Sequence, residues 1–209
     1  MGLLTIRKYG DPILRETCQP LNEISDATRL LIDDMAKTMY EYKGVGLAAS
    51  QVGVRERVVI VDSNQELISL VNPEILSREG REVASEGCLS IPDVEVDVER
   101  ATKIIVEGLD REGKRVELTL DGLVAREMQH EIDHLNGILI IDYLSFVKRQ
   151  LVKKRLAKKR PRKSGTPVRG RNTIFFVKST CVTKVSSKMA AVIKLRSGRG
   201  EEKVVLYAN

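Results

Sequence analysis

The sequence contains no tryptophan, only two histidines and only three cysteines among its 209 residues. The cysteines, Cys18, Cys88 and Cys181, are too widely spaced for a disulfide framework, so we expect reduced thiols and a cytoplasmic protein. No apolar run reaches the roughly 18 residues of a membrane span, and the start lacks the apolar segment of a secretory signal. These absences exclude the disulfide-rich and membrane-spanning classes, and we expect no membrane partner.

Acidic residues are missing from a long stretch, because none occurs between Asp142 and Glu201. Residues 1–142 carry a net charge of −11 and residues 143–209 carry +17, which together give the formal +6. A hydrophobic content of 42% fits a globular chain and is too high for complete disorder. The acidic stretch is long enough to bury a core. The charge pattern therefore separates a globular part from a basic part.

The acidic part alternates between helical and extended patterns. Apolar residues at helical spacing predict one helix over 26–42, capped by Ser25 or Asp26, and a second over 122–137. Between them lie apolar or alternating runs typical of strands, at residues 57–62, 68–72, 94–98, 103–108 and 116–120. Pro73 is expected to stop the second strand. This order predicts an α+β fold with mainly antiparallel sheets packed around the second helix.

The basic part divides again at Pro161. A thin apolar stripe predicts a basic C-terminal helix over 146–159, and residues 160–171 have the composition of a linker. Apolar runs follow at 173–177, 190–193 and 204–207, too few for an independent core. We therefore predict a domain over 1–147, a basic helix over 148–160, and an extension over 161–209 that is flexible or a small β-like appendage.

Both histidines lie in one hexapeptide of the second predicted helix, Gln129-His-Glu-Ile-Asp-His134. Residues four apart share a helix face, so His130 and His134 can bind one metal ion, with Glu131 near enough to act on water. This H-E-x-x-H pattern also arises by chance, and the alternative is an ordinary polar surface helix.

A metal site of this kind needs a third ligand, and Cys88 in Ser85-Glu-Gly-Cys-Leu-Ser90 is the candidate. A thiolate and two imidazoles with an open position suit Zn(II), Fe(II) or related first-row ions. Spacing alone does not choose among the three cysteines, but Gly87 favours Cys88 because it lets backbone approach closely. The alternative is that Cys88 is a small buried apolar residue.

A strip of small residues, Gly44-Val-Gly-Leu-Ala-Ala-Ser-Gln51, forms the third feature. Such a strip can lie against a peptide and donate backbone hydrogen bonds to it. The Gln51 amide can donate to a developing oxyanion. The alternative is a helix-to-strand turn packed beneath the sheet.

In this order, residues 44–51, 86–90 and 129–134 resemble the three signature motifs of bacterial peptide deformylases. Val71-Asn-Pro73 and Asp142-Tyr-Leu144 resemble the flanking segments of that family. The resemblance covers residues 3–155, with no departure at a motif position. The sequence after Pro161 does not match the family.

The resemblance implies a metal-dependent hydrolase that removes the formyl group from the N-terminal formyl-methionine of newly made proteins and releases formate. It implies that Cys88, His130 and His134 bind one divalent ion, Fe(II), for which Zn(II), Ni(II) or Co(II) can substitute, with no other cofactor. It assigns proton transfer to Glu131, and oxyanion binding to the Gln51 amide and the Leu89 backbone N–H.

For the substrate, the resemblance implies an apolar methionine pocket and strand-like peptide binding along the strip of small residues. The candidate substrate-binding residues are Gly44, Val45, Gly46, Leu89 and Leu123. We expect the charged ends of Arg126 and Glu127 to reach water, with only their stems in the pocket wall. We also expect Arg100 to pair with Glu86 and thereby orient the Cys88 loop.

The basic helix has two interpretations. The resemblance implies docking beside the ribosomal exit tunnel, where Lys and Arg would neutralise RNA phosphates. The other interpretation is a solvated helix with a thin packing stripe.

Two alternative functions also fit parts of the chain. One is a metallopeptidase, although no histidine follows His134. The other is an RNA-binding protein with an inactive deformylase-like domain, which the +17 charge of residues 143–209 suggests.

Overall fold

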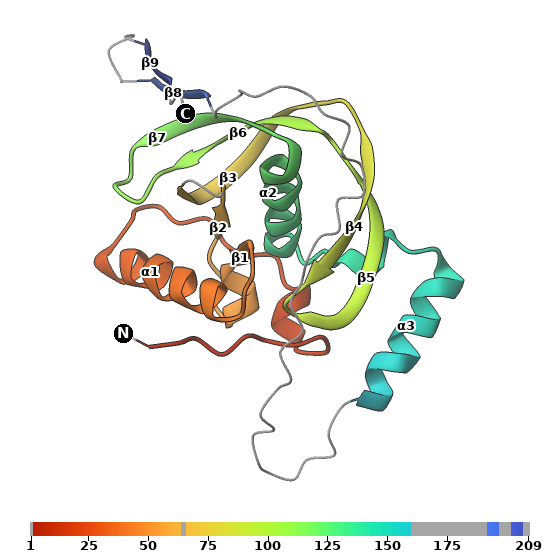
Figure 1. The fold of residues 1–209 in the computed structure, drawn as a ribbon. Helices are drawn as coiled ribbons and strands as arrows, with labels where there is room; N and C mark the ends of the chain where they lie inside the picture. The colour runs from red at the N-terminus through yellow and green to blue at the C-terminus, as the bar shows by residue number, and fades with distance from the viewer. Residues whose placement is uncertain (1, 64–65, 160–191, 197–201, 207–209) are drawn as a thin grey trace.

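The computed structural model describes residues 2–63, 66–159, 192–196 and 202–206 (Figure 1). Its helices are α1 (Asp26–Glu41), α2 (Gly122–Leu135) and α3 (Phe146–Lys159), with 3-10 helices η1 (Pro12–Arg15), η2 (Ala49–Val52) and η3 (Ile140–Tyr143). Its strands are β1 (Gly46–Ala48), β2 (Val58–Asp62), β3 (Leu67–Glu79), β4 (Glu82–Cys88), β5 (Ile91–Arg100), β6 (Lys103–Leu109), β7 (Arg115–Asp121), β8 (Val192–Arg196) and β9 (Glu202–Leu206).

The strands form two sheets, and all pairings between these strands are antiparallel. The larger sheet has the order β1-β2-β3-β6-β7-β8-β9, and β4 and β5 form a separate pair. Helix α2 lies in the space between the two sheets (Figure 1). The prediction of an α+β fold with antiparallel sheets around a central helix is confirmed.

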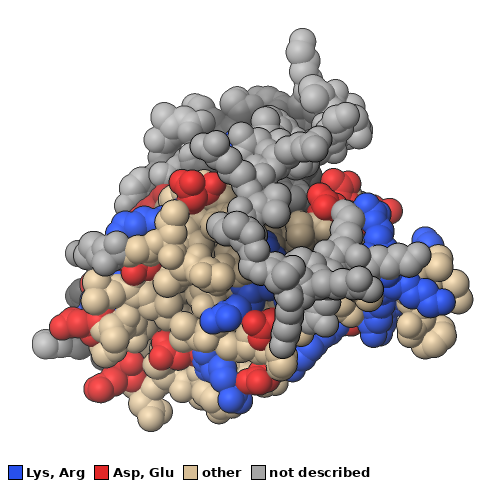
Figure 2. Space-filling view, turned by 90° about the horizontal axis from the view of Figure 1, so that it is seen from below, with Lys and Arg blue, Asp and Glu red and all other residues tan. Residues whose placement is uncertain are grey.

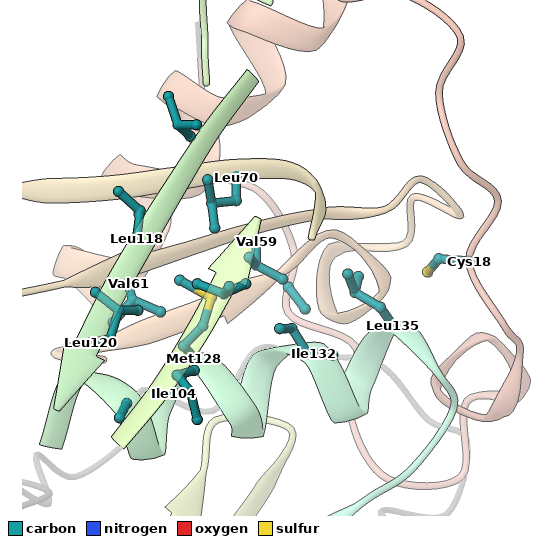
Figure 3. Close-up of a cluster of buried hydrophobic side chains, with 14 residues drawn as sticks. Cys18, Val59, Val61, Leu70, Ile104, Leu118, Leu120, Met128, Ile132 and Leu135 are labelled. Atoms are coloured by element: carbon teal, nitrogen blue, oxygen red, sulfur yellow. The ribbon is translucent and has the colours of Figure 1, made fainter. Parts of the chain in front are cut away.

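The main core forms where α2 packs against the larger sheet (Figure 3). Met128, Ile132 and Leu135 recur three or four residues apart, so they share the face of α2 that meets the sheet. Their partners include Val59 and Val61 of β2. Each such side chain contributes about 1.5–3 kcal/mol when fully buried. This packing fixes α2, and with it the hexapeptide that carries both histidines.

Strand β2 is buried on both faces. Its alternate residues Val58 and Ile60 point away from α2 and pack in a second cluster with α1. The α1 residues of that cluster are Ile32, Met35 and Met39. The side chain of Ser25 caps α1, as the sequence indicated, by accepting a hydrogen bond from the Thr28 backbone N–H at 3.2 Å. The sheet is therefore held between the two helices at this point.

The prediction that Pro73 ends a strand is wrong. Strand β3 continues through Pro73, and its register with β6 shifts between Val71 and Glu74. Asn72 there has a positive φ of 53°. Proline cannot donate to a strand ladder, but a bulge leaves one residue unpaired and so tolerates it.

The C-terminal helix α3 packs only loosely on the domain. Its Val152 and Leu156 are partly buried against the cluster that contains Cys88 and Ile91, whereas Phe146, Val147 and Leu151 are exposed.

Strand β8 pairs with β7, and β9 pairs with β8, which lengthens the larger sheet. The predicted linker and the apolar run at 173–177 lie outside the described residues. No helix in the described ranges is both long and apolar enough to cross a membrane.

Candidate metal centre

Three segments that are far apart in sequence meet beside α2. His130, Glu131 and His134 project from the buried C-terminal half of that helix. Cys88 ends β4, next to a register shift in the β4–β5 pairing. The strip at 44–51 forms β1 and the buried turn η2. The structure thus brings together all three sequence features.

The predicted ligands are close enough to share one ion. One ligand atom each from Cys88, His130 and His134 lies within 4.8 Å of the others, and all three side chains are buried. Cys88 Sγ is 3.2 Å from His134 Nε2. The two imidazole rings have centroids 5.0 Å apart and planes at 63°. A buried thiol converging with two imidazoles fits a borderline first-row metal ion.

Glu86 determines how His130 faces the centre. Its Oε2 is 3.0 Å from His130 Nδ1, which leaves Nε2 of the ring available as a ligand atom. A carboxylate on the second nitrogen fixes the tautomer and orientation of a ligand histidine. The predicted ion pair is present, because Arg100 Nε and NH2 donate to the two Glu86 oxygens at 2.9 and 3.0 Å.

Arg126 does not reach water, so the expectation for this residue is wrong. Its side chain is buried, and its NH1 donates to Glu86 Oε1 at 2.8 Å and to the Val98 carbonyl at 2.9 Å. NH2 donates to the Glu82 carbonyl at 2.8 Å. A buried carboxylate nearby provides a stronger partner than solvent at that depth. Glu127 is only partly exposed.

Glu86 is ionised in this network. Burial alone would raise its pKa, but hydrogen bonds from His130 and Arg100 lower the pKa of Glu86 to about 2. Arg100 extends the network outward, because its NH1 also donates to Asp133 Oδ2 at 2.6 Å and to the Tyr143 hydroxyl at 3.2 Å. The His130 ring is therefore held by a chain of charged groups rather than by one contact.

Glu131 is the carboxylate that remains unused by this network. It is buried, and its Oε2 has no hydrogen-bond partner among the described residues. Burial raises the pKa of Glu131 to about 7, against the opposing effect of His130 and His134. A carboxyl group with a pKa near neutrality can both accept and release a proton.

Both glycines of the strip lie in close contact with neighbouring side chains. A Cβ on Gly46 would lie 2.5 Å from Glu131 Oε1, and one on Gly44 would lie 2.8 Å from Leu89 Cδ1. Neither distance is compatible with a real side chain unless the neighbour moves. The strip therefore lies directly against Glu131 and against Leu89, in the loop that follows Cys88.

Gln51 points its amide nitrogen toward the centre. Its Oε1 accepts from the Ala48 backbone N–H at 2.7 Å, which fixes the side chain. Its Nε2 then lies 3.6 Å from Cys88 Sγ and 3.4 Å from Ser90 Oγ. The amide donor is thus oriented beside the ligand set.

The remaining predicted substrate-binding residues are at least partly accessible to solvent. Val45 and Leu123 are exposed, and Leu89 and Gly44 are partly buried. Strand β1 stands at one end of the larger sheet, paired on one side with β2. An extended peptide can add to such an edge.

Sequence reasoning missed several residues that support the site. Ser90, Asp133 and Tyr143 contact Gln51 or Arg100, and Lys8 contacts the loop after Cys88. Ser90 and Asp133 stand within the quoted motifs, so their positions in the sequence could have identified them as residues near the site. Tyr143 stands within the quoted flanking segment Asp142-Tyr-Leu144, whereas Lys8 lies far from the motifs in sequence, and only the fold brings it near.

Residues 3–150 match the family described as polypeptide deformylase. The chain belongs to this family. A peptide deformylase from Halothermothrix orenii is 54% identical over 144 residues, covering 68% of this chain and 94% of that protein. One from Thermodesulfovibrio yellowstonii is 47% identical over 165 residues, covering 77% and 100%.

Solved peptide deformylase structures have the same fold. A Legionella pneumophila structure superposes with a TM-score of 0.70 at 42% identity, covering 77% of this chain and 100% of that chain. An Acinetobacter baumannii structure with Met-Ala-Ser bound gives 0.65 at 39% identity, covering 68% and 99%. The match to the family model ends at residue 150, whereas the alignments that cover 77% of this chain extend beyond that residue.

Proposed function

We propose that this protein is a metal-dependent hydrolase that removes the N-formyl group from the N-terminal formyl-methionine of newly synthesised proteins and releases formate. The observation that carries the proposal is Glu131, a buried carboxylate whose Oε2 has no hydrogen-bond partner in the described structure, next to three converging ligand atoms. Membership of the deformylase family supports the reaction. The Acinetobacter baumannii relative bound to Met-Ala-Ser supports a methionyl peptide as the product.

Cys88, His130 and His134 would hold one divalent metal ion. We propose Fe(II), with Zn(II), Ni(II) or Co(II) as substitutes, because one thiolate and two imidazoles suit first-row ions of this kind. When bound, the ion supplies Lewis acidity to the carbonyl oxygen and to water. Glu86 supports this centre by orienting His130, with Arg100 and Arg126 holding Glu86 in place.

Glu131 would take the proton of the attacking water at its carboxylate and then deliver it to the leaving amine nitrogen. The formyl oxygen, on which negative charge develops, would accept hydrogen bonds from Gln51 Nε2 and from the Leu89 backbone N–H. Gln51 is already oriented by its bond to Ala48, so little reorganisation is needed at the moment of reaction.

The peptide would bind as an added strand along residues 44–46, next to the edge strand β1. Backbone hydrogen bonds do not depend on side chains, which suits substrates that share only their first residue. Val45, Leu89 and Leu123 would contact the methionine side chain. Gly44 and Gly46 would let the backbone lie close to the centre.

We assign the catalytic domain to residues 1–147 and the ribosome contact near the exit tunnel to the basic helix at 148–160. Lys and Arg side chains gather along the side of the molecule where α3 lies, which supports an RNA partner (Figure 2). Residues 161–209 would be an appendage to this enzyme. Newly made chains are produced in the cytoplasm, so we place the reaction there.

The deciding experiment measures formate release from formyl-Met-Ala-Ser after anaerobic addition of Fe(II). We expect release by the wild type and a loss of about 100- to 10,000-fold in the Glu131→Ala variant, because proton transfer is removed. The matched control is Glu112→Ala, at an exposed position of the β6–β7 turn.

Wild-type protein that binds metal but releases no formate would refute the proposal. Cleavage of an unformylated peptide bond instead would favour a metallopeptidase, and RNA binding without either activity would favour the inactive-domain alternative.

A further inference from the structure

A short N-terminal strap, residues 7–9, contacts both segments that carry the proposed oxyanion donors. The Arg7 backbone N–H donates to the Gln51 carbonyl oxygen at 2.7 Å, and the Tyr9 backbone N–H donates to the Ser90 carbonyl oxygen at 2.8 Å. The strap therefore joins η2 to the loop that follows Cys88. These two segments come from different sheets, so their relative position depends on such cross-contacts.

Lys8, the middle residue of the strap, makes the contact nearest to an oxyanion donor. Its Nζ donates to the Leu89 carbonyl oxygen at 2.7 Å. The same ammonium lies 5.9 Å from the centroid of the Tyr42 ring, within cation–π range. A long surface lysine loses rotamer freedom when it is held in this way, so two separate partners indicate a defined position rather than a chance contact.

The Lys8 charge also lies near the ligand set. Partial burial of the side chain lowers the pKa of Lys8, and its Coulombic interaction with Cys88 opposes that effect.

The geometry explains how Lys8 would act on the Leu89 N–H without touching the substrate. The N–H and the carbonyl of Leu89 flank the same Cα. Lys8 holds that carbonyl, and Tyr9 holds the next carbonyl along the chain. Together they restrict the backbone dihedrals on which the direction of the N–H depends. Catalytic donors must be held to about 0.5 Å by the groups around them.

We propose that Lys8 is a positioning residue that holds the Leu89 backbone N–H toward the oxyanion. The inference rests on the proposed function, because it needs Leu89 to donate in the transition state. An interaction that strengthens only in the transition state affects kcat rather than substrate binding. Lys8 should therefore matter for kcat and little for affinity.

The test compares Lys8→Met and Lys8→Arg with Lys114→Met, a control at the exposed β6–β7 turn. We expect Lys8→Met to lower kcat for formyl-Met-Ala-Ser about 10-fold or more, below the roughly 100- to 1,000-fold of a deleted donor. KM, the Kd of the product Met-Ala-Ser, metal content and Tm should change little. Lys8→Arg keeps a charged donor and should recover most of kcat, while Lys114→Met should match the wild type.

The outcomes separate this inference from the proposed function. An inactive wild type refutes the function itself. An active wild type with an equally active Lys8→Met variant overturns only the role of Lys8. The role is also overturned if kcat falls only together with metal content and Tm, or if product affinity falls in parallel. Should Lys8→Met fail to fold, Lys8→Gln is judged by the same criteria.

Discussion

At the scale of single residues, the candidate centre depends on glycines, which have no side chain, as much as on charged residues. A Cβ on Gly46 would lie 2.5 Å from Glu131 Oε1, the end of a flexible side chain. The Gly46→Ala variant should therefore keep its fold and move the carboxylate. We expect kcat to fall about 100-fold, since small displacements of catalytic groups have effects of that size. Formate release and Tm measured on the same preparation check this.

Gly2→Ala is the matched control for this prediction, because a Cβ on Gly2 would meet nothing within 4 Å. Its kcat and Tm should equal those of the wild type. Gly46→Ala with full activity would mean that Glu131 is not held against β1 during the reaction. A large fall in Tm would instead mean that the backbone, and not the carboxylate, gives way.

The ion pair between Arg100 and Glu86 leads to a second prediction at this scale. Both side chains are at least 94% buried, with exposed fractions of 6% and 3%. Arg100→Ala leaves a buried carboxylate short of a partner, which typically costs about 3–5 kcal/mol. Metal affinity should fall about 10- to 100-fold, because Glu86 orients His130. Metal titration and Tm check both effects.

The control for Arg100→Ala is Arg115→Ala, which removes an exposed ion pair with Glu107. It should leave metal affinity unchanged. If Arg100→Ala binds metal as the wild type does, the orienting role of Glu86 is wrong, or Arg126 alone maintains it.

How far the sequence predicts these residues depends on whether their relation is local. His130 and His134 share one helix turn, so their convergence follows from helix geometry. Cys88 had to be chosen among three cysteines, and helix or strand periodicity offers no criterion for that choice. The charged end of Arg126 was predicted to reach water because arginine side chains usually do. Its buried partner Glu86 is 40 positions away, and only the fold reveals it.

At the scale of elements, periodic segments were predicted well and irregular ones were not. The helix at 122–137 closely matches α2, and the strand at 103–108 matches β6. Strand β3 was cut short at Pro73, because a bulge depends on pairing with β6 and leaves no periodic signal in β3 itself. Tertiary pairing determines such features.

The junction between η3 and its neighbours gives a prediction about pH. Burial opposes ionisation of Asp142, but hydrogen bonds from Arg15 and the Leu139 backbone N–H outweigh it and lower the pKa of Asp142. A carboxyl group with a depressed folded pKa stabilises the protein above its unfolded pKa, and this stabilisation is lost as pH falls through the folded pKa.

Asp142→Asn should therefore lower Tm at pH 7. The expected loss in the free energy of unfolding is about 1 kcal/mol, because the Arg15–Asp142 pair is only partly buried. The difference from the wild type should shrink below roughly pH 4, the ordinary range of an aspartate. Asp97→Asn on the exposed face of β5 is the control and should show no such trend. A Tm difference that is constant between pH 7 and pH 3 would contradict the assignment.

At the scale of the whole molecule, the division of charge coincides with a division of structure. The family model ends at residue 150, inside α3, and this helix carries exposed apolar side chains and a run of basic residues. The two interpretations of this helix make different predictions for truncation. A docking helix is needed for ribosome binding, whereas a solvated packing helix matters only for stability.

Two truncations separate these interpretations. Deleting residues 160–209 leaves α3 in place, and deleting residues 148–209 removes it together with the partly buried Val152 and Leu156. We expect the shorter truncation to keep most ribosome co-sedimentation and the longer one to lose it. In the protein that retains α3, ribosome binding should weaken steeply between about 50 and about 200 mM salt, because the release of counterions drives phosphate contacts.

Both truncated proteins should keep kcat/KM for formyl-Met-Ala-Ser, although the longer deletion should lower Tm by several degrees through the lost apolar contacts. Co-sedimentation at low salt that survives the loss of α3 would exclude this helix as the docking element and leave it a packing role.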